Sequence, residues 1–379
     1  MPKANIGIVG GGIGGVATAV ALHQLGIEAT VYEKASRLRE AGAGMMMWPN
    51  ATRVLRHLGL LEDVFARSGS STHFLLRAPN GTVLMNIALG EFDVPAICMR
   101  RSDLLGVLLA KLKPESIRLG QTLDRLEQSG DEARISFESG LTAKHDAVIG
   151  ADGIKSRVRS ELFGHSDLIY RGYMVWRGVA HYVGGAIMPG ANSETWGAGK
   201  RFGILNTGQG KFTWYAAINV PPDHRDGPAG RQRELLGAFS GWHEPIADLI
   251  AATPDNEIMK NGAYDLVPLR RWGKGRVTLL GDAAHPCTPN LGQGGGMALE
   301  DAAVLAKCLD RETSLMSALR RYEVLRRHRT RHIQKRSRLM GEIAQLENRM
   351  VVAGRRTITG LLPARLFEYN LRRVYSYEV

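Results

Sequence analysis

The sequence predicts an α/β protein that combines a Rossmann-like domain with a second domain built on an antiparallel β-sheet, followed by C-terminal helices. Three observations predict this fold. A strand–glycine turn–helix unit opens the chain at residues 5–25, and a second such unit lies at residues 277–309. Between them, residues 170–268 contain runs of aromatic and β-branched residues, which favour strands.

The first unit has the spacing of a dinucleotide-binding turn. An apolar strand over residues 5–9 leads into Gly10, Gly12 and Gly15, and then into an expected helix over residues 14–25. The first glycine allows a tight turn, the second lets the backbone approach a pyrophosphate, and the third lets the helix pack closely on the strand. We therefore expect an adenine dinucleotide with its pyrophosphate at the N-terminus of this helix.

The next strand, expected over residues 29–32, ends at Glu33. A carboxylate about 20 residues beyond the glycines accepts a hydrogen bond from a ribose 2′-hydroxyl. A 2′-phosphate would meet like charge at Glu33, so NADP(H) is not expected as the resident ligand. The glycine-rich turn alone leaves NAD and FAD open.

The second unit favours FAD. Its apolar strand over residues 277–280 ends at Gly281 and Asp282, where a carboxylate can hold a ligand hydroxyl at the carboxyl end of a sheet. The glycine-rich stretch 292–296 then opens a helix over 297–309, whose exposed N–H groups suit the electron-rich pyrimidine side of a flavin. Taken alone, Gly281 and Asp282 are also compatible with a simple turn at the end of a strand.

Hydrophobic period and turn residues predict the elements in between. Helices are expected over residues 51–58 and 102–111, and strands over 134–138, 143–149, 170–177, 202–205 and 211–220. The stretch 221–230, rich in Pro, Gly and Asp, is expected to be a loop. These elements divide the chain into a FAD-binding domain in three parts (1–72, 99–168 and 269–335), a substrate domain in two (73–98 and 169–268), and a C-terminal helical segment (336–379).

Together with a third motif, Asp152-Gly153, the two units resemble the group A flavoprotein monooxygenases of the p-hydroxybenzoate hydroxylase fold, such as salicylate, quinolone and urate hydroxylases. Segments 38–44 and 99–104 also match, and the resemblance covers residues 4–330. It implies that an arginine of segment 99–104 contacts FAD, a role assigned to Arg101 with Arg100 as second choice. FAD binding is thus assigned to Gly10, Gly12, Gly14, Gly15, Glu33, Lys34, Arg39, Gly44, Arg101, Asp152, Gly153, Gly281, Asp282, Pro289, Gly292, Gly294 and Gly295.

The resemblance also implies the chemistry. NAD(P)H, bound only transiently, reduces a non-covalent FAD, O₂ adds at the flavin C4a carbon, and the hydroperoxide transfers one oxygen atom to a small aromatic or heteroaromatic substrate. The protein must then exclude water and position the substrate. No side chain is assigned a catalytic role. No metal is expected, because no His, Cys, Asp or Glu residues show metal-ligand spacing.

Substrate contacts are assigned to Met46, Met47, Arg201, Tyr215 and Pro289. The Met45–Met47 triplet stands where some pyridine-hydroxylating relatives have a histidine, so we expect an apolar, adaptable cavity in place of a histidine base. Arg201 is either a contact to an anionic substrate near the mouth of the cavity or a solvated surface arginine. Trp214 and Tyr215 must face opposite sides of one strand, and Tyr215 is chosen to face the cavity.

The composition is that of a large cytoplasmic protein. The chain has 379 residues, is 44% hydrophobic, and contains no uninterrupted apolar stretch of about 18 residues that could span a membrane. The first strand begins so early that no signal peptide is expected. Cys98, Cys287 and Cys308 are far apart, which indicates a reducing compartment without disulfides or structural zinc. His285, three residues after Asp282, is expected to be structural and not a catalytic base.

The net charge of +12 is concentrated in a basic helix expected over residues 320–338, with Leu319, Tyr322, Leu325 and Ile333 as a thin apolar stripe. The favoured interpretation is a solvated helix on the FAD-binding domain. A weak contact with an anionic membrane surface or ligand is the second, and nucleic-acid binding is not expected because no nucleic-acid module accompanies the charge. A monomer or a homodimer fits equally well, and the role of residues 339–379 stays open.

Two other functions also stay open. One is an FAD-dependent reductase or epoxidase of the same fold. A halogenase is disfavoured because no Trp-x-Trp-x-Ile-Pro signature is present. The other is a non-catalytic flavoprotein that contacts a membrane surface. Because the pocket is built from side chains scattered over two domains, the sequence does not name the substrate or its site of oxygenation, and it does not decide between NADH and NADPH.

Overall fold

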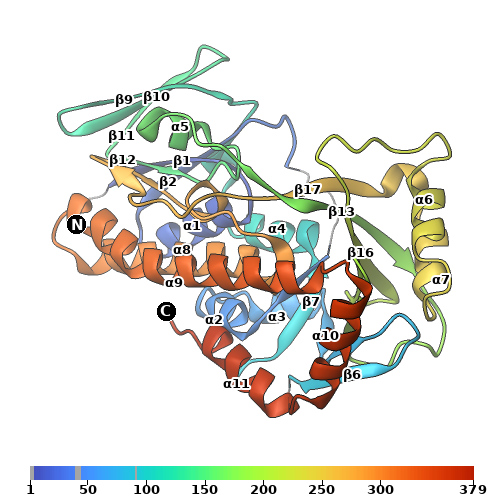
Figure 1. Ribbon diagram of the computed structural model, residues 1–379. Coiled ribbons are helices and arrows are strands. Elements are labelled where there is room, and N and C mark those ends of the chain that lie inside the picture. Colours follow the sequence, from blue (N-terminus) through green and yellow to red (C-terminus); the bar gives the residue numbers. More distant parts are fainter. Residues whose placement is uncertain (1–3, 39–43, 90–91) are drawn as a thin grey trace.

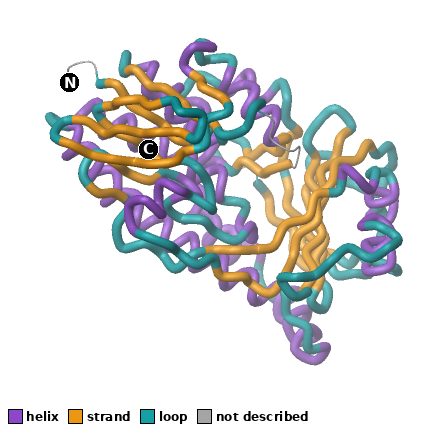
Figure 2. The backbone as a smooth tube through the Cα atoms, turned by 90° about the horizontal axis from the view of Figure 1, so that it is seen from above, coloured by secondary structure: helices purple, strands orange, loops and turns teal. Residues whose placement is uncertain are grey.

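The computed structural model describes residues 4–38, 44–89 and 92–379. Its strands gather into two groups, and helices pack around and between them (Figures 1 and 2). The first group contains a six-stranded sheet and the second a seven-stranded sheet, and two three-stranded sheets accompany them. The α/β class and the C-terminal helices that the sequence predicted are confirmed.

The six-stranded sheet has the order β18-β19-β12-β1-β2-β8 and positions the glycine motifs. Its strands are β1 (Asn5–Val9), β2 (Glu28–Glu33), β8 (Ile117–Leu119), β12 (Ala147–Gly150), β18 (Gly273–Lys274) and β19 (Val277–Leu279). All neighbours except β18 and β19 run parallel. The carboxyl ends of β19, β12, β1 and β2 therefore lie side by side at one edge, where ligands bind in open α/β sheets.

The helices of this part of the chain are α1 (Ile13–Gln24), α2 (Pro49–His57), α3 (Leu61–Phe65), α4 (Arg101–Leu109), α5 (Arg157–Phe163), α8 (Gly294–Arg311) and α9 (Leu315–Ala344). Helix α1 packs on β1 and β2, and α9 packs on β18 and β19. The first and second motif helices, α1 and α8, pack on each other, and a Cβ at Gly14 would lie 2.8 Å from Leu280 and 3.2 Å from Ala298. Glycine at this position lets the two helices approach closely.

Two small sheets flank this core. One consists of β9 (Leu123–Ser129), β10 (Glu132–Phe137) and β11 (Thr142–His145), and the other of β3 (Gly44–Met47), β4 (Gly69–Ser71) and β7 (Ala96–Arg100). The single strand expected over residues 143–149 is wrong. Asp146 interrupts it, because its carboxylate accepts a hydrogen bond from the backbone N–H of Asn5 at 2.7 Å, and the two halves join different sheets.

The seven-stranded sheet has the order β17-β13-β16-β15-β14-β5-β6. Its strands are β5 (His73–Arg77), β6 (Val83–Ala88), β13 (Ile169–His181), β14 (Ala191–Trp196), β15 (Lys200–Asn206), β16 (Lys211–Asn219) and β17 (Met259–Asp265). It is antiparallel except for the parallel pair β5 and β14. The expected loop 221–230 contains neither helix nor strand.

One face of this sheet is closed by α6 (Arg231–Ala238) and α7 (Ile246–Ala251). Trp176 and Trp214 are fully buried there among Leu235, Leu249 and Ile250. The opposite face carries Tyr173 and Tyr215. This second face is free of α6 and α7 and is the one that meets the FAD-binding part of the chain.

The chain ends in α10 (Arg349–Leu361) and α11 (Ala364–Tyr375), which pack beside β6 in the lower part of Figure 1. Short 3₁₀ turns occur at Pro114–Ser116, Asp255–Glu257, Gly281–Ala283 and Pro289–Leu291. None of the described helices combines the length and apolar character needed to cross a bilayer.

The apolar stripe expected on the basic helix is partly wrong. Leu319, Tyr322 and Ile333 of α9 are buried, but Leu325 is exposed. The 3.6-residue period places Arg326, not Leu325, on the buried side of α9, and Arg326 is fully buried. The helix is therefore not simply a solvated basic surface.

Candidate functional site

Four loops meet at the carboxyl edge of the six-stranded sheet: those after β1, β2, β12 and β19. Gly10, after β1, has φ +116°, and a Cβ there would lie 2.3 Å from the carbonyl oxygen of Ala151 after β12. A Cβ at Gly15 would lie 2.0 Å from the carbonyl oxygen of Gly10. Only glycine at both positions lets the turn, the start of α1 and the neighbouring loop pack this tightly.

Glu33 ends β2 and ties two backbone segments together. Its Oε2 accepts a hydrogen bond from the N–H of Gly11 at 2.7 Å, and its Oε1 accepts one from Ala35 at 2.9 Å. Lys34 beside it is exposed. The carboxylate thus holds the glycine turn in place, and because each of its oxygens has a second lone pair it can still accept from a ligand hydroxyl.

Asp152 follows β12 and acts as a local anchor. Its Oδ1 accepts from the Ser156 hydroxyl at 2.5 Å, and its Oδ2 accepts from the backbone N–H groups of Arg157 and Val158 at 2.7 and 3.1 Å. Burial raises the pKa of the carboxyl group although these bonds oppose the shift. The carboxylate mainly fixes the N-terminus of α5, while Gly153, with φ +79°, turns the chain beside it.

Asp282 follows β19 through Gly281, which has φ +61°. Its side chain is accessible to solvent, yet the protein around it raises the pKa of the carboxyl group by desolvation, against the opposing effects of His285 and Arg101. A Cβ at Gly294, the first residue of α8, would lie 4.0 Å from Asp282 Oδ1. The carboxylate and the N-terminus of α8 therefore lie next to each other.

The start of α8 is also bounded by the methionine strand β3. A Cβ at Gly295 would lie 2.2 Å from Met45 Cε, and one at Gly292, where φ is +59°, would lie 3.2 Å from Trp48 Nε1. Met45 and Trp48 thus frame the glycine-rich entry to α8.

A network of buried charged residues lies behind this edge, and the sequence did not predict it. The Asp301 carboxylate accepts from the N–H of Gly281 at 2.9 Å and from Arg326 Nε at 2.6 Å, and it forms a 2.5 Å hydrogen bond with His285 Nε2. Glu300 forms ion pairs of 2.6 Å with Arg326 and Arg329. The sequence did contain one clue to this network: two adjacent acids interrupt the apolar helix α8. The basic helix α9, which packs on α8, contains two acids, Glu323 and Glu342.

These bonds lower the pKa of both acids. Burial alone would raise the pKa of Asp301 and of Glu300, but His285 and Arg326 lower the first, and Arg326 and Arg329 lower the second. His285 is buried within this network, in the structural role expected of it. The network fixes Gly281, and so the position of Asp282, from behind.

A second polar network joins the inner face of the seven-stranded sheet to the loop before α8. Arg201 Nη2 and the Tyr173 hydroxyl both donate to Asn290 Oδ1, at 2.7 and 2.9 Å. Arg201 Nη1 pairs with Glu194 at 2.9 Å, and the Tyr215 hydroxyl also bonds to Glu194. Burial and Glu194 raise the pKa of Tyr215 well above its ordinary value, so the phenol stays protonated.

This network corrects the alternative that Arg201 is a solvated surface residue. Arg201 is buried, and its remaining Nε donates to Gln345 Oε1 at 2.9 Å. Tyr215 lies on this inner face, where Gly203 leaves room for its ring, whereas Trp214 faces α7 and donates to Thr253 at 2.8 Å. Pro289, next to Asn290, is exposed.

An apolar cluster lies beside these polar groups. It contains Met46, Trp48, Phe74, Trp196 and Tyr375, and the Trp48 and Tyr375 rings stack with centroids 4.0 Å apart. Met47 points to the other side of β3 and is fully buried in the core of the FAD-binding part. Substrate contact is therefore retained as a proposal for Met46 and dropped for Met47.

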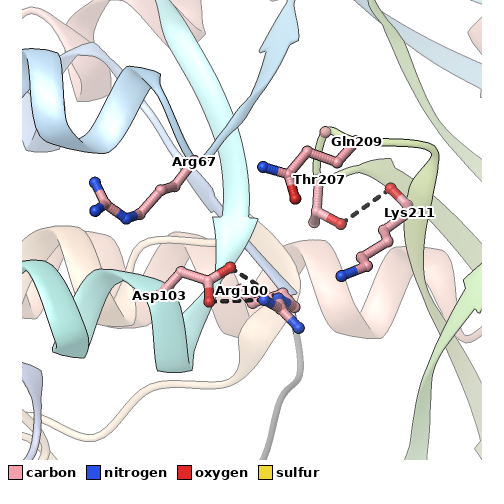
Figure 3. A pocket seen from close by; sticks show the side chains of 7 residues that line it. Arg67, Arg100, Asp103, Thr207, Gln209 and Lys211 are labelled. Atoms are coloured by element: carbon pink, nitrogen blue, oxygen red, sulfur yellow. Dashed lines mark hydrogen bonds and ion pairs between the residues drawn. The ribbon is translucent and has the colours of Figure 1, made fainter.

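A basic pocket of about 180 Å³ opens where the two parts of the chain meet (Figure 3). Arg100 and Asp103 come from the end of β7 and the start of α4, and Lys211 from the start of β16. Arg100 forms an ion pair of 2.8 Å with Asp103. Together with Arg67, the lining carries a surplus of positive charge next to Arg101.

The described residues fit a dinucleotide that carries a flavin. The glycine cradle at Gly10 and Gly15 would be filled by any Cβ, a carboxylate adjoins the N-terminus of α8, and Arg101 lies close enough to lower the pKa of Asp282. Gly12 caps α1, and Gly44 opens β3. Arg39 lies outside the described residues. The fold and this edge define a flavoprotein oxidoreductase with a Rossmann-like cofactor domain and a separate substrate sheet.

The chain belongs to the family described as FAD binding domain, whose model matches residues 3–337. It is 37% identical over 370 residues to an aurachin C monooxygenase/isomerase of Stigmatella aurantiaca, with 97% of this chain and 96% of that one covered. It is 32% identical to an FAD-dependent urate hydroxylase of Klebsiella oxytoca, covering 87% and 88%.

A solved structure of Klebsiella pneumoniae HpxO with FAD and uric acid superimposes with a TM-score of 0.93 at 27% identity, covering 98% of this chain and 97% of that one. The chain is thus an FAD-dependent member of a monooxygenase family, as its motifs predicted. FAD is its cofactor, and NAD(P)H is the co-substrate typical of the family.

Proposed function

We propose that the protein hydroxylates a neutral, planar phenol or N-heteroaromatic, using NAD(P)H and O₂. The observation that carries this proposal is the junction at Asn290. Its side chain joins the inner face of the seven-stranded sheet to the loop that leads into α8. A substrate held between the apolar cluster and this junction would lie beside the cofactor edge.

The charge state of the junction favours a neutral substrate. Arg201 is neutralised by Glu194, and all three of its bonded nitrogens are directed to protein groups. An anionic substrate would have to break a buried ion pair to bind there, which costs several kcal/mol. We therefore revise the expectation that Arg201 binds an anionic group and propose that it positions Asn290 and Glu194.

The side chains of the site would have the following roles. FAD supplies the redox and oxygen chemistry when bound. Met46, Trp48 and Phe74 would bury the aromatic ring and exclude water. Tyr215 would orient the polar substituent, because its phenol remains protonated. Asn290 would keep the junction rigid, since its Oδ1 accepts from Arg201 and Tyr173 and its Nδ2 donates to Thr288 and to the Ser337 carbonyl.

A matched substrate pair tests this proposal. A neutral phenol or N-heteroaromatic should stimulate NAD(P)H oxidation and oxygen uptake by the holoenzyme. The same ring with an added carboxylate should have a KM raised at least about tenfold, since the buried ion pair opposes it. A preference for the carboxylated member would contradict the neutral site.

The basic pocket of Figure 3 gives a second expectation. We propose that a phosphate of NAD(P)H enters this pocket, because cations gather there and no described residue forms an ion pair with Lys211. Lys211→Met should raise the KM for NAD(P)H about tenfold, the loss of one charge-assisted bond, and leave kcat unchanged. Lys274→Met, an exposed lysine of β18, is the control. Equal KM values in the two variants would show that the pocket does not bind a phosphate of NAD(P)H.

Several narrower points remain proposals. We propose that the chain is divided into a three-part FAD-binding domain and a two-part substrate domain, with β7 in the former because it pairs with β3 and β4. We also propose that the protein is a monomer or homodimer and that it is cytoplasmic. A weak contact between residues 320–338 and an anionic surface is proposed as well. The product distinguishes the alternatives. A hydroxylase forms a hydroxylated ring, an epoxidase forms an epoxide, and a reductase forms no oxygenated substrate.

A further inference from the structure

Helix α9 runs across the molecule from the six-stranded sheet to the seven-stranded sheet (Figure 1). Its first half packs on β18, β19 and α8, where Arg326 pairs with Glu300 and Asp301 behind the cofactor edge. Its last turns contact the loop before α8, which carries Asn290. A single helix therefore touches both the cofactor edge and the junction at Asn290.

The side of α9 that faces this junction carries two polar residues and one glycine. Ser337, Gly341 and Gln345 follow one another at intervals of four residues, which places them on one side of the helix, and all three are buried. Ser337 Oγ donates to the carbonyl oxygen of Thr288 at 2.6 Å. The last turns of α9 thus hold the loop before α8 through hydrogen bonds and close packing.

Gly341 lets the backbone of α9 approach Asn290. Glycine destabilises a helix relative to alanine, and here close packing requires it, because a Cβ at Gly341 would lie 2.4 Å from Asn290 Nδ2. That amide nitrogen donates to Thr288 Oγ1 at 2.9 Å and to the Ser337 carbonyl oxygen at 2.8 Å. A side chain at position 341 would therefore displace the amide that joins the substrate sheet to the loop.

Gln345, the residue directly after α9, is bonded at both ends of its amide. Its Oε1 accepts from Arg201 Nε at 2.9 Å, and its Nε2 donates to Asn219 Oδ1 at 2.6 Å. Asn219 Nδ2 donates in return to the backbone oxygen of Gln345 at 2.9 Å. The next carbonyl oxygen, that of Leu346, accepts from the N–H of Gly199 at 2.8 Å. The end of α9 is thereby tied to the substrate sheet, and Gln345 fixes the direction of the Arg201 guanidinium.

The guanidinium carries this constraint into the site. Arg201 Nη1 pairs with Glu194 at 2.9 Å, and the Tyr215 hydroxyl bonds to the same carboxylate. Each of the three Arg201 nitrogens has a protein acceptor, namely Gln345, Glu194 and Asn290. Without Gln345 a buried N–H group would lose its acceptor, which is costly enough that the guanidinium is expected to reorient. Glu194 and Tyr215 would then move with it.

We propose that Gln345 and Gly341 are positioning residues of the substrate site. Gln345 aligns Arg201 and, through Glu194, the Tyr215 hydroxyl, whereas Gly341 sets the place of Asn290. This role rests on the proposed function, in which Tyr215 orients the polar substituent of an aromatic substrate. A change at either residue is expected to shift the ring relative to the cofactor, and a shift of about 1 Å is enough to impair an oriented reaction strongly.

Three variants of the FAD-loaded protein test these roles. Gln345→Met removes both side-chain bonds and keeps the length of the side chain. Gln345→Glu keeps an acceptor for Arg201 and should restore most of the native behaviour. Gly341→Ala adds one methyl group against Asn290.

Each role has a matched control. Thr253→Val removes another buried hydrogen bond of the substrate sheet, that from Trp214 Nε1 at 2.8 Å on the opposite face. It should lower the thermal midpoint without changing the substrate site. Gly354→Ala replaces a glycine of α10 whose Cβ would meet no atom within 4 Å. It controls for the change of glycine to alanine in a helix.

The first measurement is the binding of two neutral planar probes, 2-naphthol and 4-hydroxyquinoline, followed by the absorbance of the bound FAD without NAD(P)H. The Kd should rise about tenfold in Gln345→Met and in Gly341→Ala, the effect of one misplaced hydrogen bond, and stay unchanged in both controls. In turnover the same two variants should release a larger share of the consumed NAD(P)H equivalents as hydrogen peroxide.

The second measurement needs no substrate. In the FAD-loaded protein labelled with 3-fluorotyrosine, Tyr215→Phe and Tyr173→Phe assign the fluorine NMR signals of the two tyrosines that belong to the junction. Gln345→Met should shift the signal of Tyr215, and Gly341→Ala that of Tyr173, whose hydroxyl donates to Asn290. Thr253→Val and Gly354→Ala should leave both signals in place.

Unmoved signals in Gln345→Met and Gly341→Ala would overturn the proposal, and so would moved signals with an unchanged Kd for a probe that the native protein binds. A native protein that binds neither probe would contradict the proposed function instead. The fluorine signals would then still decide whether the end of α9 positions Tyr215 and Asn290.

Discussion

Replacing Asp282 with alanine is expected to weaken FAD binding by about 10- to 100-fold. The carboxylate lies beside the N-terminus of α8, at the edge where β19 ends, and would accept charge-assisted hydrogen bonds from cofactor hydroxyls. Such a bond contributes about 1.5–3 kcal/mol. Equilibrium dialysis or flavin fluorescence on the apoprotein gives the dissociation constant directly.

Two variants control for this result. Asp310→Ala removes an exposed carboxylate near the far end of the same helix and should leave FAD affinity unchanged. Asp282→Asn keeps the shape and loses the charge, so it should fall between the native protein and the alanine variant. If Asp282→Ala and Asp310→Ala retain equal amounts of FAD, the role of Asp282 is wrong.

The second large effect concerns stability. Arg326→Leu is expected to lower the free energy of unfolding by about 3–5 kcal/mol, because it leaves Glu300 and Asp301 buried without their shared partner. Arg331→Leu, an exposed position on the same helix, should change it by no more than about 0.5 kcal/mol. Denaturant titration of the FAD-loaded proteins measures both values. Similar losses in the two variants would show that the buried network does not contribute as described.

The same network predicts a pH dependence. The pKa values of Glu300 and Asp301 are lower in the folded protein than their ordinary values, so the ionised acids stabilise the fold above those ordinary values. This contribution should be lost as the pH falls below about 4 and through the lower folded-state values. In Arg326→Leu the decrease in stability at acidic pH should be smaller than in the native protein. If the thermal midpoints of the two proteins depend on acidic pH in the same way, the network does not contribute as described.

The glycine motifs were predictable because they are local. Gly10, Gly15 and Gly281 are demanded by backbone conformation and close approach, which spacing along the chain encodes. Parallel strands then bring their carboxyl ends together without further information. The cofactor edge and the α/β class therefore followed from the sequence.

The networks were not predictable in the same way. The bond from Arg201 to Asn290 joins positions 89 residues apart, and the bond from Arg326 to Asp301 joins positions 25 apart on two packed helices. Their pairing depends on which face of each element is buried. The sequence placed Leu325 on the buried side of α9, whereas the structure buries Arg326, the next residue. For this reason the buried network was not predicted.

The exposure of Met350, Val351, Ile358 and Leu361 on α10 was not predicted, for a related reason. Helical spacing of apolar residues predicts an amphipathic helix but does not say which side meets the protein. Burial of the apolar side is the usual outcome, and in α10 the bonds of Arg355 reverse it. Only the packing shows this.

An FAD-dependent monooxygenase that acts on an aromatic ring must transfer one atom of O₂ to its substrate. Turnover of an aromatic substrate with NAD(P)H under ¹⁸O₂, followed by mass spectrometry of the product, measures this transfer. We expect one labelled oxygen atom in a hydroxylated product for each NAD(P)H consumed in coupled turnover. Label confined to peroxide and water, with the substrate recovered unchanged, would contradict it and leave a reductase.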